Sequence, residues 1–213
     1  MKIIAINGSP RKNWNTATLL QKALDGADSQ NAETEMFHLY ELKYRGCVSC
    51  FGCKRKDGDH TCALQDDLTP VLEKLKNADA IIFGSPIYFM SVTSGMSSFL
   101  ERFLYPYIKY DLECPSLFSK KMLTGFIYTM GSTEEWIEPF KANLNHFDRF
   151  LEMVFGEKTM SLYSYNTYQY SDYNKYESSM FNEKEKAKCR KEQFPLDCQS
   201  AFDLGATLTK NVK

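Results

Sequence analysis

Apolar runs of strand length alternate along this chain with segments that carry apolar residues at helical spacing. The apolar runs predict five strands, at Ile3–Gly8, Glu33–Tyr40, Ala78–Gly84, Met122–Thr129 and Val154–Tyr163. Amphipathic helices are predicted between them, and a last helix is predicted over Asn182–Asn211. The run ADAIIFG is the most apolar, which is typical of a central parallel strand. This alternation predicts an α/β protein, a three-layer structure around a parallel sheet with right-handed crossovers.

Two of the helix predictions rest on local signals at the helix start. One helix is predicted to begin near Asp66. Pro70 is compatible with this start, because proline is tolerated in the first turn of a helix. Ser132 and Glu135 have the spacing of a capping box, so a long amphipathic helix is predicted to follow them and to reach Leu151.

Composition narrows the class of protein. A chain of 213 residues is long enough for one well-packed domain, so a single domain over residues 1–213 is predicted, with loops at 45–65 and 163–176. Its 26 Lys and Arg residues balance 27 Asp and Glu residues, which disfavours a nucleic-acid partner. No apolar stretch approaches the roughly 20 residues of a membrane span, and the N-terminus lacks a signal-peptide pattern. We therefore expect a cytoplasmic protein with no membrane partner.

The turn after the first strand has the composition of an anion site. The sequence GSPRKNWNTATLL leads from Gly8 into a helix. Backbone N–H groups and the positive end of the helix dipole both favour an anion at a helix N-terminus, and the polar side chains of this turn add donors. The Walker and Gly-x-Gly-x-x-Gly patterns are both absent from the turn. The turn therefore favours a single terminal phosphate, with an ordinary polar turn as the alternative.

The loop after the central strand is the second candidate. SPIYFMSVTSGM begins at Ser85 and places a stiff, partly aromatic backbone directly after the strand. Ligands of open α/β sheets bind beyond the carboxyl ends of the strands, so loops 9–16, 85–94 and 129–132 are predicted to meet at one site. Apolar contacts and main-chain donors there suit a flat ring system. The alternative is a well-packed corner between strand and helix.

Four of the seven cysteines lie close together in sequence, at Cys47, Cys50, Cys53 and Cys62. In a cytosolic chain such clustering indicates metal or redox chemistry rather than disulfides. Thiolates at Cys-x2-Cys-x2-Cys spacing can close around one iron–sulfur cluster, whereas structural zinc more often uses two separated pairs. Because eight residues separate Cys53 from Cys62, a cluster, zinc and a loop of free thiols all stay open.

The remaining polar features predict surface or packing roles. The sequence places no nucleophile obviously beside any of the three histidines, His38, His60 and His146, which argues against a hydrolase triad. We predict no catalytic proton-transfer residue. The basic run 184–191 is interpreted as a solvated helix face. The tyrosine-rich segment 163–176 is interpreted as an active-site flap, a subunit contact or plain surface packing.

Together these motifs resemble a known family. GSPRKNWNTATLL, followed by DAIIFGSPIYFMSVTSGMSSFLERF, is similar to the NAD(P)H-dependent FMN reductase family of flavodoxin-like oxidoreductases. The intervening GCVSCFGCKRKDGDHTCALQDD resembles its iron–sulfur flavoprotein branch. The similarity covers roughly the first 135 residues well. It implies a flavodoxin-like three-layer sandwich with a five-stranded parallel sheet in the order 2-1-3-4-5.

The resemblance also assigns site residues. It implies that the FMN phosphate is held by Ser9, Arg11, Asn15, Thr16, Ala17 and Thr18. The isoalloxazine ring would be lined by Pro86, Ile87, Tyr88 and Phe89, with Met130, Gly131 and Ser132 on its other flank. The ligands of a [4Fe-4S] cluster would be Cys47, Cys50, Cys53 and Cys62.

The function implied by the resemblance is electron transfer from NAD(P)H through bound FMN to a second acceptor, such as a quinone or free flavin. The flavin itself carries hydride transfer, so the protein needs few acids or bases. Homodimers or homotetramers with active sites near the subunit interface are expected. The alternative function is an iron–sulfur flavoprotein that acts as a one-electron carrier or redox sensor for a protein partner, and a third is a scaffold without FMN.

Overall fold

The computed structural model describes residues 1–111, 113 and 116–212. Its strands are β1 (Lys2–Asn7), β2 (Glu33–His38), β3 (Ala80–Tyr88), β4 (Ser91–Val92), β5 (Leu123–Thr129) and β6 (Met160–Ser164). Its α-helices are α1 (Asn15–Asp28), α2 (Thr69–Lys76), α3 (Ser94–Leu104), α4 (Glu134–Ile137), α5 (Lys141–Leu144), α6 (His146–Phe155), α7 (Glu183–Glu192) and α8 (Phe194–Asn211). Short 3-10 turns are η1 (Leu39–Glu41), η2 (Gly52–Lys54), η3 (Tyr105–Tyr107), η4 (Glu138–Phe140) and η5 (Tyr173–Lys175). None of the described helices is both long and apolar enough to cross a membrane.

The long strands form one parallel sheet in the order β2-β1-β3-β5-β6. Counting only these strands along the chain, this is the predicted order 2-1-3-4-5, and the predicted α/β class is confirmed. The two-residue strand β4 lies outside this order and pairs antiparallel with the end of β3. The most apolar strand, β3, is central in the sheet. A central strand is covered on both faces and has no solvent-facing positions, so a continuous apolar sequence suits this place.

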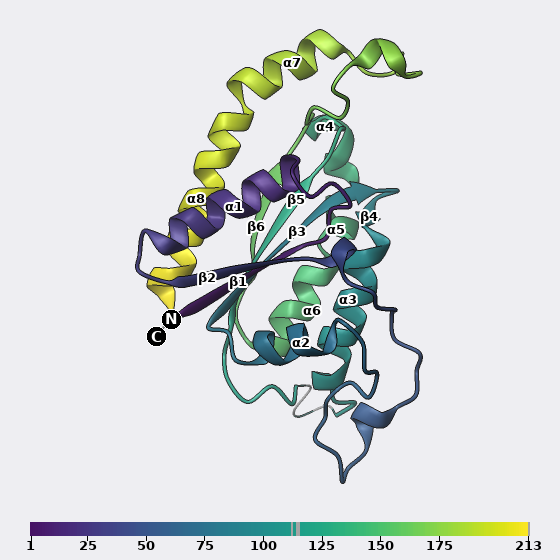
Figure 1. Ribbon diagram of the computed structural model, residues 1–213, viewed down its shortest axis with the longest axis vertical. Coiled ribbons are helices and arrows are strands. Elements are labelled where there is room, and N and C mark those ends of the chain that lie inside the picture. Colours follow the sequence, from purple (N-terminus) through teal and green to yellow (C-terminus); the bar gives the residue numbers. More distant parts are fainter. Residues whose placement is uncertain (112, 114–115, 213) are drawn as a thin grey trace.

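Helices cover both faces of the sheet and complete the three layers (Figure 1). On one face, α1 and α8 pack over side chains that include Ile3 and Ile82. On the other face, α2, α3 and α6 pack over side chains that include Ile4 and Ile81. Neighbouring residues of a strand point to opposite faces, so each of these apolar runs supplies both cores.

Two glycines allow α1 and α8 to pack in close contact. A Cβ atom at Gly26 would lie 2.0 Å from the carbonyl oxygen of Phe202. A Cβ atom at Gly205 would lie 1.8 Å from the carbonyl oxygen of Ala23. Any side chain at either position would separate the helices, so glycine is required here by close approach.

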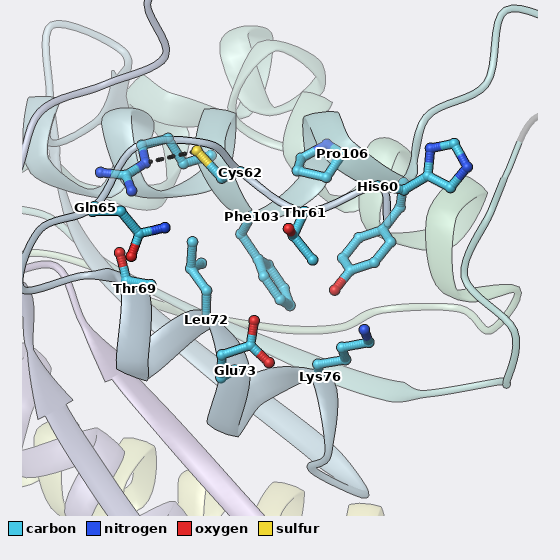
Figure 2. A pocket seen from close by; sticks show the side chains of 12 residues that line it. His60, Thr61, Cys62, Gln65, Thr69, Leu72, Glu73, Lys76, Phe103 and Pro106 are labelled. Atoms are coloured by element: carbon cyan, nitrogen blue, oxygen red, sulfur yellow. Dashed lines mark hydrogen bonds between the residues drawn. The ribbon is translucent and has the colours of Figure 1, made fainter. Parts of the chain in front are cut away.

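The cysteine loop, residues 45–65, runs from β2 and η1 to α2 and has little regular structure apart from η2. It lies beside α2 and α3 at the end of the molecule remote from α7 (Figure 1). Residues of the loop and of these two helices border the pocket shown in Figure 2. The sequence predicts this segment as a loop, and the structure agrees.

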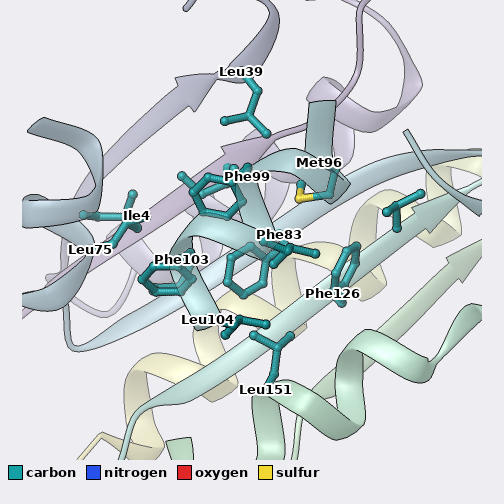
Figure 3. Packing of buried hydrophobic residues seen from close by; sticks show 14 of the residues in the cluster. Ile4, Leu39, Leu75, Phe83, Met96, Phe99, Phe103, Leu104, Phe126 and Leu151 are labelled. Atoms are coloured by element: carbon teal, nitrogen blue, oxygen red, sulfur yellow. The ribbon is translucent and has the colours of Figure 1, made fainter. Parts of the chain in front are cut away.

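Aromatic rings fill the core between the sheet and α3 (Figure 3). The ring centroid of Phe83 lies 6.1 Å from that of Phe99, 6.3 Å from Phe103 and 5.6 Å from Phe126. Such separations are within the range of favourable aromatic pairs. These contacts fix α3 on the sheet, and with it the loop that precedes the helix.

The predicted capping box at Ser132 and Glu135 is wrong. Thr133 is the N-cap residue of α4, and no side-chain hydrogen bond caps this helix in the described part of the chain. Instead of one long helix, the chain forms α4, η4, α5 and α6. Pro139 cannot donate a helical N–H group, and a second break follows at Asn145, so the amphipathic pattern is spread over short pieces.

Other predicted element boundaries also differ, among them the start of α2 at Thr69 rather than near Asp66. Val154 belongs to α6, which ends at Phe155 and is followed by Gly156 in the left-handed conformation (φ 74°), so the last strand begins only at Met160. The final helix is divided into α7 and α8 at Gln193. β2 ends at His38, and the next residues turn into η1.

Candidate cofactor site

The loops that follow β1, β3 and β5 meet at the carboxyl end of the sheet. The N–H group of Gly8 donates to the carbonyl of Gly84 at 2.8 Å, and the Thr93 hydroxyl donates to the carbonyl of Gly8 at 2.6 Å. The hydroxyl oxygens of Thr16 and Thr129 are 2.7 Å apart. The predicted convergence of the three loops is therefore present, at the edge where open α/β sheets bind ligands.

The first turn of α1 fits an anion. Trp14 precedes the helix in extended conformation, and among the described residues no side chain caps the helix and no acid lies in its first turn. The first N–H groups of a helix have no intrahelical acceptor, so an anion can accept from them. Ser9, Asn15 and Thr16 are buried beside this turn. Backbone donors and hydroxyls without a carboxylate are the donor set that a phosphate monoester requires.

Several residues predicted to hold a phosphate, Asn15 among them, are already engaged within the chain. Ala17 is buried in α1, and the Thr18 hydroxyl donates to the Trp14 carbonyl at 3.0 Å. The Asn15 amide accepts from Arg190 Nη1 at 2.8 Å. The Arg11 guanidinium lies 3.9 Å from the centre of the Trp14 ring.

Residues 164–169, which we call the crossing segment, run from the end of β6 to the first turn of α1. Trp14 Nε1 and Asn15 Nδ2 each donate to the carbonyl of Tyr168 at 2.9 Å. Arg11 Nη1 donates to the carbonyl of Gln169 at 2.5 Å. The tyrosine-rich segment thus lies beside the predicted phosphate turn, and two of the predicted phosphate ligands, Arg11 and Asn15, are bonded to it.

The predicted loop after the central strand is a hairpin. β3 continues through Pro86 and Ile87 to Tyr88, which pairs with Ser91 of β4. The two residues of the turn, Phe89 and Met90, both have left-handed backbone (φ 49° and 62°), which glycine or asparagine usually supplies. Phe89 is fully exposed and Tyr88 is 46% exposed. The structure therefore presents two aromatic rings on a strained turn beside the site.

The third predicted group is Met130, Gly131 and Ser132, and its first and last residues accept hydrogen bonds from the crossing segment. The N–H group of Thr167 donates to the Met130 carbonyl at 2.9 Å, and that of Asn166 donates to the Ser132 carbonyl at 2.8 Å. Met130 is buried. The crossing segment therefore joins the loop after β5 to the first turn of α1.

Lys186 of α7 holds this arrangement together. Its side chain is 1% exposed, and its ammonium group donates to the Gly131 carbonyl at 2.6 Å, to Asn166 Oδ1 at 3.0 Å and to the Thr167 carbonyl at 3.4 Å. Burial lowers the pKa of Lys186. The interpretation of 184–191 as a solvated face is wrong for this lysine, because the carbonyls that surround it come from distant segments.

The four clustered cysteines line one small pocket together with Arg102. Cys53 is buried, which raises the pKa of its thiol, whereas Cys50 is exposed. Within the described residues, no group of three or more His, Cys, Asp or Glu side chains is arranged to hold a metal ion. The assignment of the four cysteines as cluster ligands stays a prediction.

Arg102 of α3 fastens the cysteine loop. Its side chain is fully buried and forms an ion pair with Asp66. Its Nε atom donates to Cys62 Sγ at 3.3 Å (Figure 2). Its other donors reach the carbonyls of Arg45 at 3.2 Å and Leu64 at 3.1 Å.

Sequence reasoning missed Arg102, Gln169 and Lys186. Arg102 lies on the apolar face of α3 between Phe99 and Phe103, and a charge at such a position signals a buried partner. Lys186 and Gln169 lie in polar segments whose composition is that of a surface. No local pattern separates them from their exposed neighbours.

Comparison with known proteins places the chain among flavoproteins. Residues 1–160 match the family model of NADPH-dependent FMN reductases. An iron–sulfur flavoprotein of Methanocaldococcus jannaschii is 37% identical over 102 residues, which are 48% of this chain and 51% of that protein. An iron–sulfur flavoprotein of Archaeoglobus fulgidus is 38% identical over 102 residues, which are 48% of each chain. The chain spans about half the length of the curated relatives it matches.

Solved structures share the fold. An NAD(P)H:quinone oxidoreductase from Methanothermobacter marburgensis aligns with a TM-score of 0.69 at 14% identity, over 98% of this chain and 96% of that one. An archaeal flavodoxin aligns with a TM-score of 0.51 at 15% identity, over 100% of this chain and 99% of that one. These likenesses confirm the predicted flavodoxin-like fold. The match of the family model over residues 1–160 shows that this chain belongs to the NADPH-dependent FMN reductase family.

Proposed function

We propose that this protein is an oxidoreductase that binds FMN, takes electrons from NAD(P)H and passes them to a small acceptor such as a quinone or free flavin. The observation that carries this proposal is the uncapped first turn of α1, at the meeting point of the three loops. Membership of the family supports the same class of reaction. When bound, FMN supplies the hydride chemistry, and the protein positions the reactants.

The residues at the site would divide the work of binding. Ser9, Thr16 and the N–H groups of the first turn of α1 would hold the FMN phosphate, where the helix dipole favours negative charge. Pro86 to Phe89 would line one side of the isoalloxazine ring, and Met130 to Ser132 would flank the other. The aromatic and apolar side chains of the hairpin would limit the access of water to the ring.

The test of cofactor binding compares FMN with riboflavin by quenching of flavin fluorescence. Several charge-assisted hydrogen bonds to the phosphate make FMN bind on the order of 100-fold more tightly than riboflavin. Equal affinity for the two flavins would remove the phosphate site from the proposal. A failure to bind either flavin would overturn the proposed function.

The test of the reaction follows NAD(P)H oxidation by the FMN-loaded protein. Steady turnover with a quinone or free flavin supports the proposed enzyme. Bleaching of the bound flavin by neither NADH nor NADPH under anaerobic conditions would contradict it. The same assay settles the preference between the two nucleotides.

A second candidate is a one-electron carrier or redox sensor for a protein partner. The specific observation in its favour is that the four clustered thiols line one pocket. Iron and labile-sulfide analysis of anaerobically purified protein tests it. Iron together with flavin reduction only by a ferredoxin-like protein would favour the carrier, whereas protein without iron that turns over NAD(P)H favours the enzyme.

We also propose a homodimer or homotetramer. Large apolar side chains are exposed on the isolated chain, among them Phe89, Trp136 and Phe150. Exposed apolar groups of this size often lie in protein interfaces. Light scattering coupled to size-exclusion chromatography distinguishes a monomer from either assembly.

A further inference from the structure

The crossing segment lies outside the part of the chain that matches the family model, which ends at residue 160. It nevertheless contacts two of the three loops of the site. Its backbone bonds to Met130 and Ser132 on one side, and its carbonyls accept from Arg11 and Trp14 on the other. This placement makes it a fourth segment at the carboxyl edge of the sheet.

Gln169 has its backbone fully held. Its N–H group donates to the Tyr173 hydroxyl at 3.0 Å, and its carbonyl accepts from Arg11. These bonds direct the side chain toward the loop after β5. There, the amide lies so close to Gly131 that a Cβ atom at Gly131 would be 2.1 Å from Gln169 Nε2. Because residue 131 is a glycine, the space beside its Cα atom is occupied by the Gln169 amide.

The side-chain oxygen of Gln169 lacks a donor. Among the described residues, Oε1 of Gln169 is buried and has no hydrogen-bond partner. Burial of an amide oxygen without a donor is costly, because the bond to water is lost and nothing replaces it. A ligand bound in the neighbouring site that donates to Oε1 would satisfy this acceptor.

Lys186 fixes the surroundings of this amide. Its ammonium group joins Gly131 to Asn166 and Thr167, three residues before and two residues before Gln169. The crossing segment and the Gly131 loop are therefore tied together by one buried side chain. An acceptor held in place in this way pays little entropy when a ligand donates to it.

We propose that Gln169 is a cofactor-contacting residue, whose Oε1 accepts a hydrogen bond from FMN bound in the site. FMN carries two kinds of hydrogen-bond donor, the N3–H group of the isoalloxazine ring and the ribityl hydroxyls. The inference rests on the proposed function, because it requires FMN in this crevice. It adds a recognition element from the part of the chain beyond the family match.

The first test measures FMN affinity by fluorescence quenching for Gln169→Leu and Gln169→Met. Both variants remove the amide acceptor while keeping the side-chain volume similar. The dissociation constant is expected to rise about tenfold, the loss of one hydrogen bond. The control is Gln199→Leu, because Gln199 is an exposed residue of α8 whose amide bonds to Asp203. It is expected to bind FMN like the wild type.

Thermal melting of the proteins without flavin separates ligand contact from structural support. If Gln169 contacts FMN, the Leu and Met variants melt at or above the wild-type temperature, because an orphaned buried oxygen is removed. A role in folding predicts the reverse, with a lower melting temperature and unchanged FMN affinity. That reverse result overturns the proposal.

Flavin analogues identify the donor. If the N3–H group donates, N3-methyl-FMN binds the wild type more weakly than FMN does, and the difference disappears in Gln169→Leu. If a ribityl hydroxyl donates, a deoxyribityl analogue shows that behaviour instead. Either non-additive pair supports the proposal, and full additivity for all analogues contradicts it. Wild-type protein that binds no FMN would overturn the proposed function itself, whereas equal binding by wild type and variants overturns only the role of Gln169.

Discussion

Two irregular parts of this molecule are each held by a single buried cation, and the two cations are bonded differently. Arg102 holds the cysteine loop and Lys186 holds the crossing segment, and each is 1% exposed. Arg102 has a carboxylate partner, Asp66, in addition to carbonyl and thiol acceptors. In the described part of the chain, the acceptors of Lys186 are the carbonyl groups of Gly131, Asn166 and Thr167. The charge of Arg102 is neutralised by a carboxylate, whereas the charge of Lys186 is stabilised by neutral carbonyl dipoles.

The difference shows in the pKa values of the two cations. Burial alone lowers the pKa of a cation, and for Lys186 this effect prevails. For Arg102, burial acts in the same direction, but the hydrogen bonds to Asp66 and Cys62 outweigh it and raise the pKa. The cysteine loop is thus fastened by a pair without net charge. The crossing segment leaves a positive charge beside Gly131, where an electron-accepting cofactor is proposed to bind.

The largest effect is expected for Arg102→Met. The substitution keeps an unbranched side chain but leaves Asp66 and the carbonyls of Arg45 and Leu64 without their donor. Breaking a buried ion pair from one side costs about 3 kcal/mol or more of the free energy of unfolding. Urea denaturation measures it. The control is Arg55→Met in the same loop, because Arg55 pairs with Asp57 at the surface, and the loss there is expected to be much smaller because water screens an exposed ion pair.

A smaller loss is expected for Lys186→Met. The variant leaves acceptors at Gly131 and Thr167 without a donor, but it also removes the cost of burying an unpaired charge. The net destabilisation is therefore about 1.5 kcal/mol, less than for Arg102→Met. The control is Lys188→Met on the exposed side of α7. If the two lysine variants unfold at the same urea concentration, the ammonium group of Lys186 does not hold the crossing segment.

The fold was largely predictable from the sequence, but the roles of the two buried cations, Arg102 and Lys186, were not. We call these two residues the anchors. The apolar runs around Ile4, Ile82 and Phe126 specify buried strands, because strands covered on both faces need continuous apolar sequence. The convergence of three polar turns follows from the parallel sheet alone. Burial of Lys186 instead depends on carbonyls of residues 131, 166 and 167, which are brought together only by tertiary packing. The charge pattern along α7 does not indicate that these carbonyls lie beside Lys186.

The break in the predicted long helix has a similar lesson. Its apolar positions repeat with helical spacing, and the pattern predicts a continuous helix through Pro139. The structure keeps the spacing but divides it between α4, α5 and α6. Periodicity reports which side chains face the core, and it does not report whether the backbone between them is regular.

A still smaller effect is expected for Cys62→Ala. The thiol is one of several acceptors of Arg102, and the ion pair with Asp66 is kept. The expected loss is about 0.5 to 1 kcal/mol of the free energy of unfolding. The control is Cys50→Ala, because Cys50 is exposed in the same loop. A loss as large as that of Arg102→Met would mean that Cys62, rather than Asp66, is the main partner of the guanidinium.

The smallest effect expected is a pH dependence that separates the two anchors. The pKa of Lys186 in the folded protein lies below its ordinary value of 10.5, so between these two values the unfolded chain binds more protons than the folded chain. Stability therefore rises with pH through this window, because the folded protein loses a buried charge that the unfolded chain still carries in water.

Below the folded pKa both states are protonated, and the cost of burial is fully present. Relative to Lys186→Met, the wild type is thus expected to gain a few tenths of a kcal/mol as the pH approaches 10.5. Burial raises the pKa of Cys189, and the nearby Lys186 ammonium partly offsets that rise. The thiol pKa is therefore raised further in the Met variant, which loses more stability as the unfolded thiol titrates, so this effect acts in the same direction. Tyrosine titration is common to both proteins and cancels in the difference. The same comparison for Arg102→Met is expected to be flat, since a guanidinium with a raised pKa keeps its proton throughout. If the stability of the wild type relative to Lys186→Met instead falls with rising pH, the ammonium of Lys186 is stabilised by a carboxylate-like partner. The contrast between Arg102 and Lys186 would then be lost.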